Sequence, residues 1–148
     1  MRAGRSRADR PDTASGTTRV RAEVHDGLEQ TMLGIVRALA VVGTPSDAAY
    51  GRIWAQQTDD RHLLVGSRAE AGHGFRAVIG LTRGRGRTDV EYAITRLPGG
   101  DALHSAVLQF ELLLIEALRR LDPDADVRLL GTALRDLERT RAVQDGGR

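Results

Sequence analysis

Two polar residues, His104 and Glu111, lie beside an apolar stripe in the C-terminal half of the chain and are the first candidates for chemistry. Seven residues apart on a helix, they differ by roughly 20° around the axis but by about 10 Å along it, so they cannot hydrogen-bond each other. A carboxyl group held against apolar neighbours has a raised pKa and can act as a general acid or base. The two residues therefore support an enzymatic alternative. The opposing interpretation places both at the rim of the helix, with their polar ends in water.

Aromatic residues make up only 3% of the chain, and three of them are candidates for lining a pocket. Trp54, Tyr92 and Phe110, together with Glu111, are our candidate ligand-binding residues. The alternative is that a small domain uses its few aromatic side chains in its core, where their large apolar surface stabilises it most. The sequence leaves both interpretations open.

Arg83, Arg85 and Arg87 alternate with glycines and raise the question of a nucleic-acid contact. Arginine side chains in such segments can contact phosphate backbones. The same pattern is typical of a hairpin tip, where glycine adopts positive φ and arginine keeps the turn in water. We favour the hairpin, because binding of nucleic acid would be more credible in a basic domain with exposed aromatic residues.

The positive charge of the chain is concentrated at its start. All 22 basic residues are arginine, and residues 1–21 hold six of them against two acids. The rest of the chain holds slightly more acids than arginines, so the folded part is nearly neutral and no nucleic-acid partner is expected for it. Residues 1–18 have no apolar period, and we predict that they form a disordered, Arg-rich tail.

Several kinds of site have no support in the sequence. The chain has no cysteine, which excludes disulfides, thiolate metal sites and cysteine nucleophiles. Small groups of His and acidic residues at 25–29 and 59–62 fit helix-cap and turn chemistry better than a zinc site. We therefore expect no metal and no cofactor. No apolar run is long enough to span a bilayer and no signal peptide is evident, so we expect no membrane contact and a cytoplasmic location.

Hydrophobic periodicity predicts an α+β fold that would position these residues, with an antiparallel sheet packed against helices. In chain order, we expect a strand at 18–24, a helix from Asp26, strands at 50–57, 61–68, 75–82 and 88–97, a long helix over 101–121 and a short helix over 125–143. The elements from 19 to 121 are expected to form a single domain. Residues 122–148 are expected to form a C-terminal helical extension with a frayed end.

This order of elements resembles the helix-grip architecture of the START and Bet v 1-like proteins, which include polyketide cyclases. It is also similar to the half-domain of TATA-binding-protein-like proteins. The resemblance covers about residues 18–121 and rests on element order, without a diagnostic motif. It implies a curved sheet that grips the long C-terminal helix, with any ligand held between the two. It implies no catalytic residue, because no family motif is present to carry one over.

The long predicted helix over 101–121 has apolar residues around most of its circumference, including Leu112 and Leu113. Such a helix needs a second covering surface, which would be the 125–143 helix or a second copy of the chain in a homodimer. We expect a non-enzymatic module that binds an apolar small molecule or another protein. The alternatives are a cyclase-like or hydrolase-like enzyme acting through Glu111 or His104, and a weak nucleic-acid binder using the tail and the Arg83–Arg87 tip.

Overall fold

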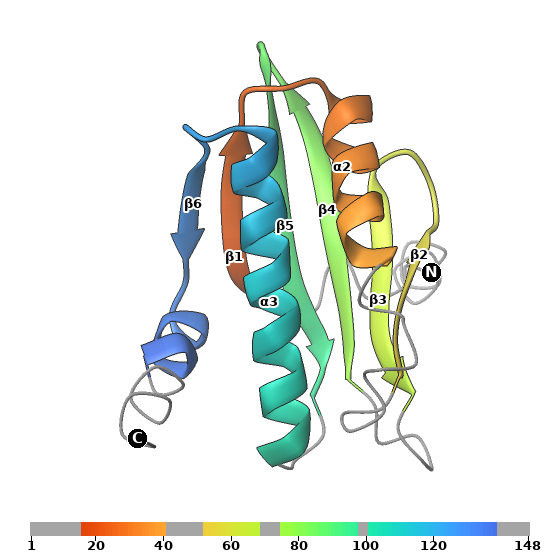
Figure 1. Cartoon of the computed structure of the whole chain (residues 1–148), viewed down its shortest axis with the longest axis vertical. Helices are drawn as coiled ribbons and strands as arrows, with labels where there is room; N and C mark the ends of the chain where they lie inside the picture. Colours follow the sequence, from red (N-terminus) through yellow and green to blue (C-terminus); the bar gives the residue numbers. More distant parts are fainter. Residues whose placement is uncertain (1–15, 41–51, 69–74, 98–100, 139–148) are drawn as a thin grey trace, which may run out of the picture.

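A computed structural model of the chain describes residues 16–40, 52–68, 75–97 and 101–138. Within them, one antiparallel sheet carries two helices on one face (Figure 1). The elements in chain order are β1 (Thr17–Val24), α2 (Leu28–Ala40), β2 (Arg52–Gln57), β3 (His62–Arg68), β4 (Arg76–Gly84), β5 (Arg87–Arg96), α3 (Asp101–Leu121) and β6 (Asp126–Leu129). Residues 132–138 form a further short helix. The predicted α+β class, with a sheet packed on helices, is confirmed.

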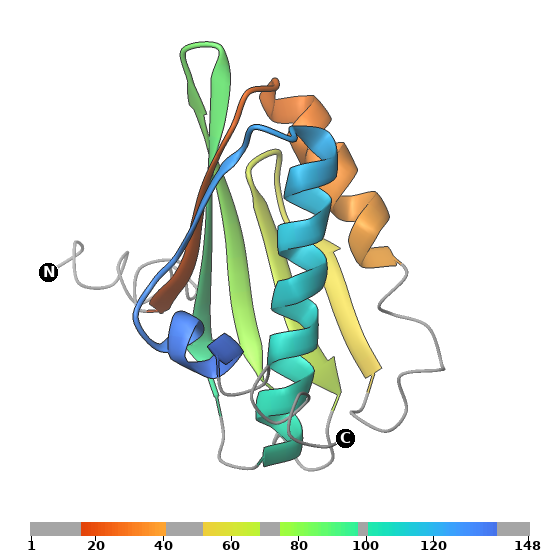
Figure 2. The ribbon, with the colours of Figure 1, turned by 60° about the vertical axis from the view of Figure 1, so that its left-hand side comes forward.

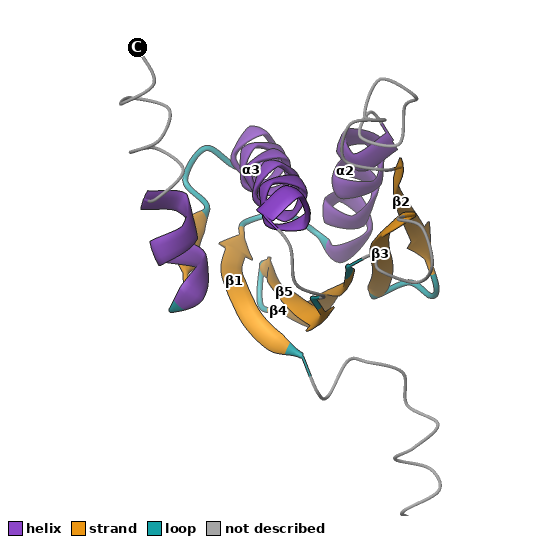
Figure 3. Cartoon of the chain, turned by 90° about the horizontal axis from the view of Figure 1, so that it is seen from below, coloured by secondary structure: helices purple, strands orange, loops and turns teal. Residues whose placement is uncertain are grey.

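The sheet has the strand order β2-β3-β4-β5-β1-β6, and every neighbouring pair is antiparallel. Strands β2 to β5 follow one another as a meander, while β1, the first strand in the chain, lies between β5 and β6. Helices α2 and α3 lie side by side on the same face of the curved sheet (Figures 2 and 3). The sheet therefore has an inner face beneath the helices and an outer face that neither helix covers.

The period of two in β4 and β5 separates these two faces. Ile79 of β4 is paired with Tyr92 of β5, and both side chains are fully buried in the core beneath the helices. Asp89 and Glu91, which alternate with the core residues of β5, belong to the outer face. The prediction that each of these two strands has one buried and one solvent-exposed face is confirmed.

The two helices pack closely at Gly34 of α2. A Cβ atom at this position would lie 2.5 Å from a methyl carbon of Leu121, in the last turn of α3. No real Cβ contact is that short, so a larger residue would push the end of α3 away from α2. The absence of a side chain at Gly34 therefore sets how closely the two helices approach each other.

The interpretation of residues 125–143 as one helix is wrong in its first part. Residues 126–129 form β6, which is paired with β1, and helical residues begin only at 132. Gly131 lies between the two elements with a φ of 51°, in the left-handed region that favours glycine. Val127 and Leu129 fit a strand as well as a helix, and the free edge of β1 provides the backbone partners that decide between them.

Parts of three predictions lie outside the described residues. They are residues 1–15 of the predicted tail, residues 50–51 of the predicted strand 50–57, and residues 139–148 of the predicted C-terminal extension. No helix among the residues that the structure describes is both long and apolar enough to cross a membrane.

The tip of the β4–β5 hairpin provides a first test of local structure. Gly86 has a φ of 63° in the turn that joins Gly84 to Arg87, which are paired with each other. We expect Gly86→Ala to lower the free energy of unfolding by about 1–2 kcal/mol, the cost of a left-handed conformation for a residue with a Cβ atom. Urea denaturation measures the change. Gly27→Ala is the matched control, because a Cβ atom at Gly27 meets nothing within 4 Å; equal losses in both variants would contradict the prediction.

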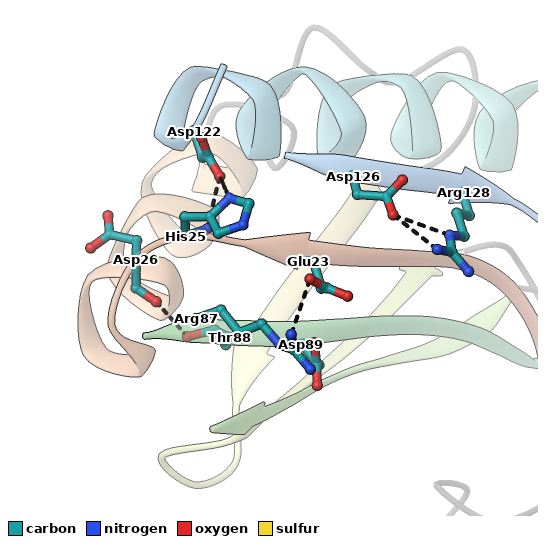
Figure 4. Close-up of polar contacts among 9 residues, drawn as sticks. All are labelled: Glu23, His25, Asp26, Arg87, Thr88, Asp89, Asp122, Asp126 and Arg128. Atoms are coloured by element: carbon teal, nitrogen blue, oxygen red, sulfur yellow. Dashed lines mark hydrogen bonds and ion pairs between the residues drawn. The ribbon is translucent and has the colours of Figure 1, made fainter. Parts of the chain in front are cut away.

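Asp122, just after α3, connects the end of this helix to the end of β1 (Figure 4). Its Oδ2 accepts a hydrogen bond from the backbone N–H of His25 at 2.8 Å and lies 2.7 Å from Nδ1 of the same residue. Its Oδ1 accepts a hydrogen bond from the backbone N–H of Asp124 at 2.9 Å. These hydrogen bonds hold the pKa of the Asp122 carboxyl below its ordinary value, and the bond from the His25 backbone has the largest effect.

This lowered pKa predicts a pH dependence of stability. A carboxyl group with a lower pKa in the folded state stabilises the fold above its unfolded pKa, and the contribution is lost as the pH falls through the folded pKa. We therefore expect the wild type to lose stability more steeply below about pH 4 than Asp122→Asn, which has no charge to lose at this position. Melting temperatures of both proteins between neutral and acid pH measure the effect. Parallel curves would contradict it.

Candidate functional site

The space between the sheet and α3, where the resemblance implies a ligand, contains three packed aromatic rings. Phe110 of α3 lies with its ring centroid 5.9 Å from that of Tyr92 and 6.3 Å from that of Phe75. All three side chains are fully buried, together with Leu114 and Leu118 of the same helix. Tyr92 and Phe110 are therefore close together, as two residues of one ligand site would be. Both side chains, however, are buried in the packed core.

Trp54 lies on the other face of the sheet. It belongs to β2 and is paired with Gly66 of β3, where a Cβ atom would come within 2.7 Å of the indole ring. The guanidinium carbon of Arg76 lies 5.3 Å from the centre of the same ring, a cation–π arrangement. The structure therefore does not bring Trp54 together with the other candidate ligand-binding residues.

Glu111, the candidate common to the binding and enzymatic interpretations, is fully buried and paired with Arg19. Arg19 Nε donates to one carboxylate oxygen of Glu111 at 2.5 Å, and its Nη2 donates to the other at 2.9 Å. The same Nη2 donates to Asp136, in the C-terminal helix, at 3.0 Å. One arginine thus joins β1, α3 and the C-terminal segment.

Arg19 reaches this position because of a β-bulge in β1. Thr18 is paired with Ala93 and Val20 with Tyr92, so Arg19 is an extra residue without a counterpart on β5. A bulge lets two successive residues share one face of a strand, and Arg19 consequently reaches the inner face beside Val20. Its carbonyl oxygen accepts a hydrogen bond from the backbone N–H of Leu130 at 2.9 Å. In a regular strand Arg19 would face the side opposite to Val20, and the bulge is the reason that it does not.

The electrostatics of this cluster follow from its burial. Burial raises the pKa of the Glu111 carboxyl above its ordinary value, although the hydrogen bonds and charge of Arg19 oppose the rise. Burial, followed by the nearby Glu111 carboxylate, also raises the pKa of Tyr92 well above its usual range. Because Glu111 is fully buried and held through both oxygens, the geometry favours a structural role that secures the C-terminal segment.

The remaining candidates lie in three places. His104 belongs to the first turn of α3, and its side chain is outside the described part of the structure. Arg83 and Arg85 are exposed at the β4–β5 hairpin, as the hairpin interpretation predicted. Arg87 lies between two acids, 3.4 Å from Glu23 and 3.5 Å from Asp89 (Figure 4).

A second group of residues forms a concavity of about 460 Å³ on the outer face of the sheet, which we call the outer concavity. Its lining combines small residues with charged side chains from β1, β5 and β6. The lining consists of Arg21, Ala22, Glu23, His62, Val78, Gly80, Leu81, Thr82, Asp89, Val90, Glu91, Ala93, Asp126 and Arg128. Sequence reasoning missed this site, although the acids alternating with core residues in β5 were a signal for it.

The lining of the outer concavity has four carboxylates and only two guanidinium groups. Arg21 donates to Glu91 at 3.1 Å, and Arg128 donates to Asp126 at 3.0 Å. The two other acids, Glu23 and Asp89, share the guanidinium of Arg87 at the longer distances of 3.4 and 3.5 Å. Of the four carboxylates, those of Glu23 and Asp89 are therefore the least neutralised by neighbouring guanidinium groups.

A smaller concavity of about 440 Å³ lies between the hairpin tip and the start of α2. Its lining includes Arg83 and Arg87 but also Asp26 and Glu29. Because charges of both signs line it equally, it has no preference for a phosphate group. This smaller concavity therefore gives no support to the alternative that the protein binds nucleic acid.

The apolar residues of α3 that point away from the sheet remain uncovered by the described chain. Leu112 and Leu113 are 43% and 38% exposed, and Leu134 of the C-terminal helix is 44% exposed. The C-terminal segment buries Ala133, Asp136 and Leu137 instead. Of the two covering surfaces that the sequence allows, the described part of the C-terminal segment leaves Leu112 and Leu113 exposed, and the homodimer stays a prediction.

Within the described ranges, no three His, Asp or Glu side chains are grouped so that they could hold a metal ion. No family model matches the chain, and no curated protein matches it. Among solved structures, the chain is similar to CalU16 from Micromonospora echinospora, with 12% sequence identity and a TM-score of 0.39 over 76% of this chain and 81% of the other. At this TM-score the likeness is coarse, and it identifies no ligand or site residue in this chain.

Proposed function

We propose that the chain is a non-enzymatic binding module and that its ligand binds in the outer concavity. The observation that carries the proposal is the lining of this concavity, with its volume of about 460 Å³ and its surplus of carboxylates. Ligand sites in proteins commonly have volumes of about 300–1,000 Å³. The rings of Phe75, Tyr92 and Phe110 support this choice over the space beneath α3, since they are fully buried there and packed against one another.

The lining favours a polar ligand with positive charge. Four acids face two arginines, and the ion pairs leave Glu23 and Asp89 sharing one guanidinium. An amine or guanidinium group of a ligand would add a second cation between these carboxylates and form charge-assisted hydrogen bonds with them. A small organic cation or the side chain of a basic peptide satisfies this chemistry, whereas a nucleic acid does not.

Titration with a hexa-arginine peptide at low ionic strength tests the proposal, with backbone amide shifts as the readout. We expect shifts at Arg21, Glu23, Asp89 and Glu91, and we expect Glu23→Gln/Asp89→Asn to weaken binding about tenfold, since it removes two exposed charge pairs that contribute about 0.2–1 kcal/mol each. Asp60→Asn is the charge control, because Asp60 is an exposed acid in the β2–β3 turn. Equal affinity in the two variants would reject the proposal.

A steric variant tests the same site without changing its charge. Gly80 is part of the lining, and a Cβ atom there would meet the His62 ring at 3.6 Å, an ordinary contact. Gly80→Ala is therefore expected to bind the peptide as the wild type does, whereas the ring introduced by Gly80→Phe would occupy the concavity and abolish the amide shifts. Unchanged binding by Gly80→Phe would place the peptide elsewhere.

A further inference from the structure

The described chain begins at one end of the outer concavity. Gly16 lies so close to β5 that a Cβ atom at this position would be 3.1 Å from the Cβ atom of Ala93 and 3.0 Å from a methyl carbon of Thr95. Ala93 is part of the lining of the concavity. Residues 1–15 are therefore attached next to this site, whatever course they take from there.

The charge of residues 1–15 is opposite to that of the outer concavity. This segment contains four arginines and two acids, namely Arg2, Arg5, Arg7, Arg10, Asp9 and Asp12. The lining of the concavity contains four acids and two arginines, and Arg87, outside the lining, pairs with two of the acids, which leaves one negative charge in surplus. Because the domain itself is nearly neutral, the surplus of positive charge before β1 and the surplus of negative charge beside it are complementary at short range.

The length of the segment is sufficient to reach the far end of the concavity. From Ala93 to Asp89, at the other end of the lining, β5 advances four residues, or about 13 Å. Fifteen extended residues span up to about 50 Å. An arginine of the segment can therefore reach Glu23 and Asp89 even if the chain is far from fully extended.

We infer that residues 1–15 bind in the outer concavity of their own domain, with an arginine as a second cation beside Glu23 and Asp89, which otherwise share only the guanidinium of Arg87, and that they compete there with external cationic ligands. The inference rests on the proposed function of the concavity. It assigns the Arg-rich segment a regulatory role, because a tethered segment is present at an effective concentration of roughly millimolar and must be displaced before a ligand binds.

A spin label tests where the segment lies in the full-length chain. The chain has no cysteine, so Ser6→Cys provides a unique site for a nitroxide label. We expect paramagnetic broadening of the amides of Glu23, Asp89 and Glu91, and we expect Glu23→Gln/Asp89→Asn or high salt to remove it. Broadening confined to other surfaces, or no broadening at any described residue, would overturn the inference.

Competition is measured with the hexa-arginine peptide on the full chain and on a variant in which Arg2, Arg5, Arg7 and Arg10 are replaced by serine. We expect the variant to bind the peptide roughly two- to tenfold more tightly than the wild type, because its segment competes less. Equal affinities, with amide shifts in the concavity, would reject the inference and leave the proposed function intact. No shifts in the concavity of either protein would reject the proposed function, and the spin label would then decide the inference by itself.

Discussion

Arg19→Ala is expected to lower the free energy of unfolding by about 3–5 kcal/mol, because it leaves the Glu111 carboxylate buried without its partner. Arg19 is 4% exposed and donates to both oxygens of Glu111 and to Asp136. Domains of this size are typically stable by about 5–15 kcal/mol, so the loss would be a large part of the total. Chemical denaturation at neutral pH measures it.

Arg21→Ala is the matched control for this prediction. Arg21 is two residues away on the same strand, but its side chain is 61% exposed on the outer face. Its ion pair with Glu91 lies in water, and such pairs contribute about 0–1 kcal/mol. We therefore expect a loss below about 1 kcal/mol for Arg21→Ala. Similar losses for the two arginines would show that the buried pair contributes no more than a surface contact.

The pH dependence of the Arg19 variant has a definite sign. Because the pKa of Glu111 is raised in the folded state, the stability associated with this group is greatest below its unfolded pKa and is lost as the pH rises through the folded pKa. Removing Arg19 removes the groups that oppose this rise. The deficit of Arg19→Ala is therefore expected to be smaller at about pH 5 than at about pH 8. A deficit independent of pH would contradict this account of Glu111.

A double variant separates the loss of the pair from the cost of an unpaired charge. Arg19→Met/Glu111→Leu replaces both charged groups by apolar side chains of similar size, a change that is often neutral or stabilising. We expect it to recover most of the stability that Arg19→Ala loses. Failure to recover would indicate that the contact of Arg19 with Asp136 dominates.

Phe110→Ala is expected to lower the free energy of unfolding by about 3–5 kcal/mol, since it removes a buried ring and leaves a cavity. Phe110 is fully buried between α3 and the sheet and contacts the rings of Phe75 and Tyr92. Leu112→Ala, on the exposed side of the same helix, is the control. Leu112 is 43% exposed, so its loss is expected to be below about 1 kcal/mol.

The same variant tests where an apolar ligand could bind. An engineered apolar cavity can take up benzene, and the resulting rise in melting temperature is expected for Phe110→Ala and not for the wild type. A comparable rise in the wild type would mean that an open pocket exists beneath α3. That result would favour the ligand position implied by the helix-grip resemblance over the outer concavity.

Local patterns in the sequence were sufficient to predict most of the elements. β4 and β5 alternate clearly, and the apolar stripe of α3 ends at Asp122 and Pro123, as the turn residues indicate. These features depend on the chain within a few residues of each position, which is why periodicity detects them. The burial of Phe110 followed from the same stripe, and the core alternative for the aromatic residues holds for Phe110 and Tyr92.

The candidate sites depended on contacts between distant residues, which periodicity does not contain. Glu111 was recognised as a polar group against an apolar stripe, but its partner Arg19 lies 92 residues earlier. Trp54 was grouped with Tyr92 because both are aromatic, whereas strand pairing places it on the opposite face. The outer concavity combines acids from β1, β5 and β6, which meet only because β1 lies between the other two strands.

The sequence by itself determined the α+β class, the buried and exposed faces of β4 and β5 and the uneven distribution of arginine along the chain, since these follow from composition and local period. Only the tertiary structure decided that a bulge brings Arg19 inward and that residues 126–129 become a strand. In both cases the cause is pairing with β1: backbone groups at its edge select a strand for β6, and its irregular register with β5 reverses the direction of one side chain. The Arg-rich start of the chain thus contributes its last two arginines, Arg19 and Arg21, to opposite faces of one strand.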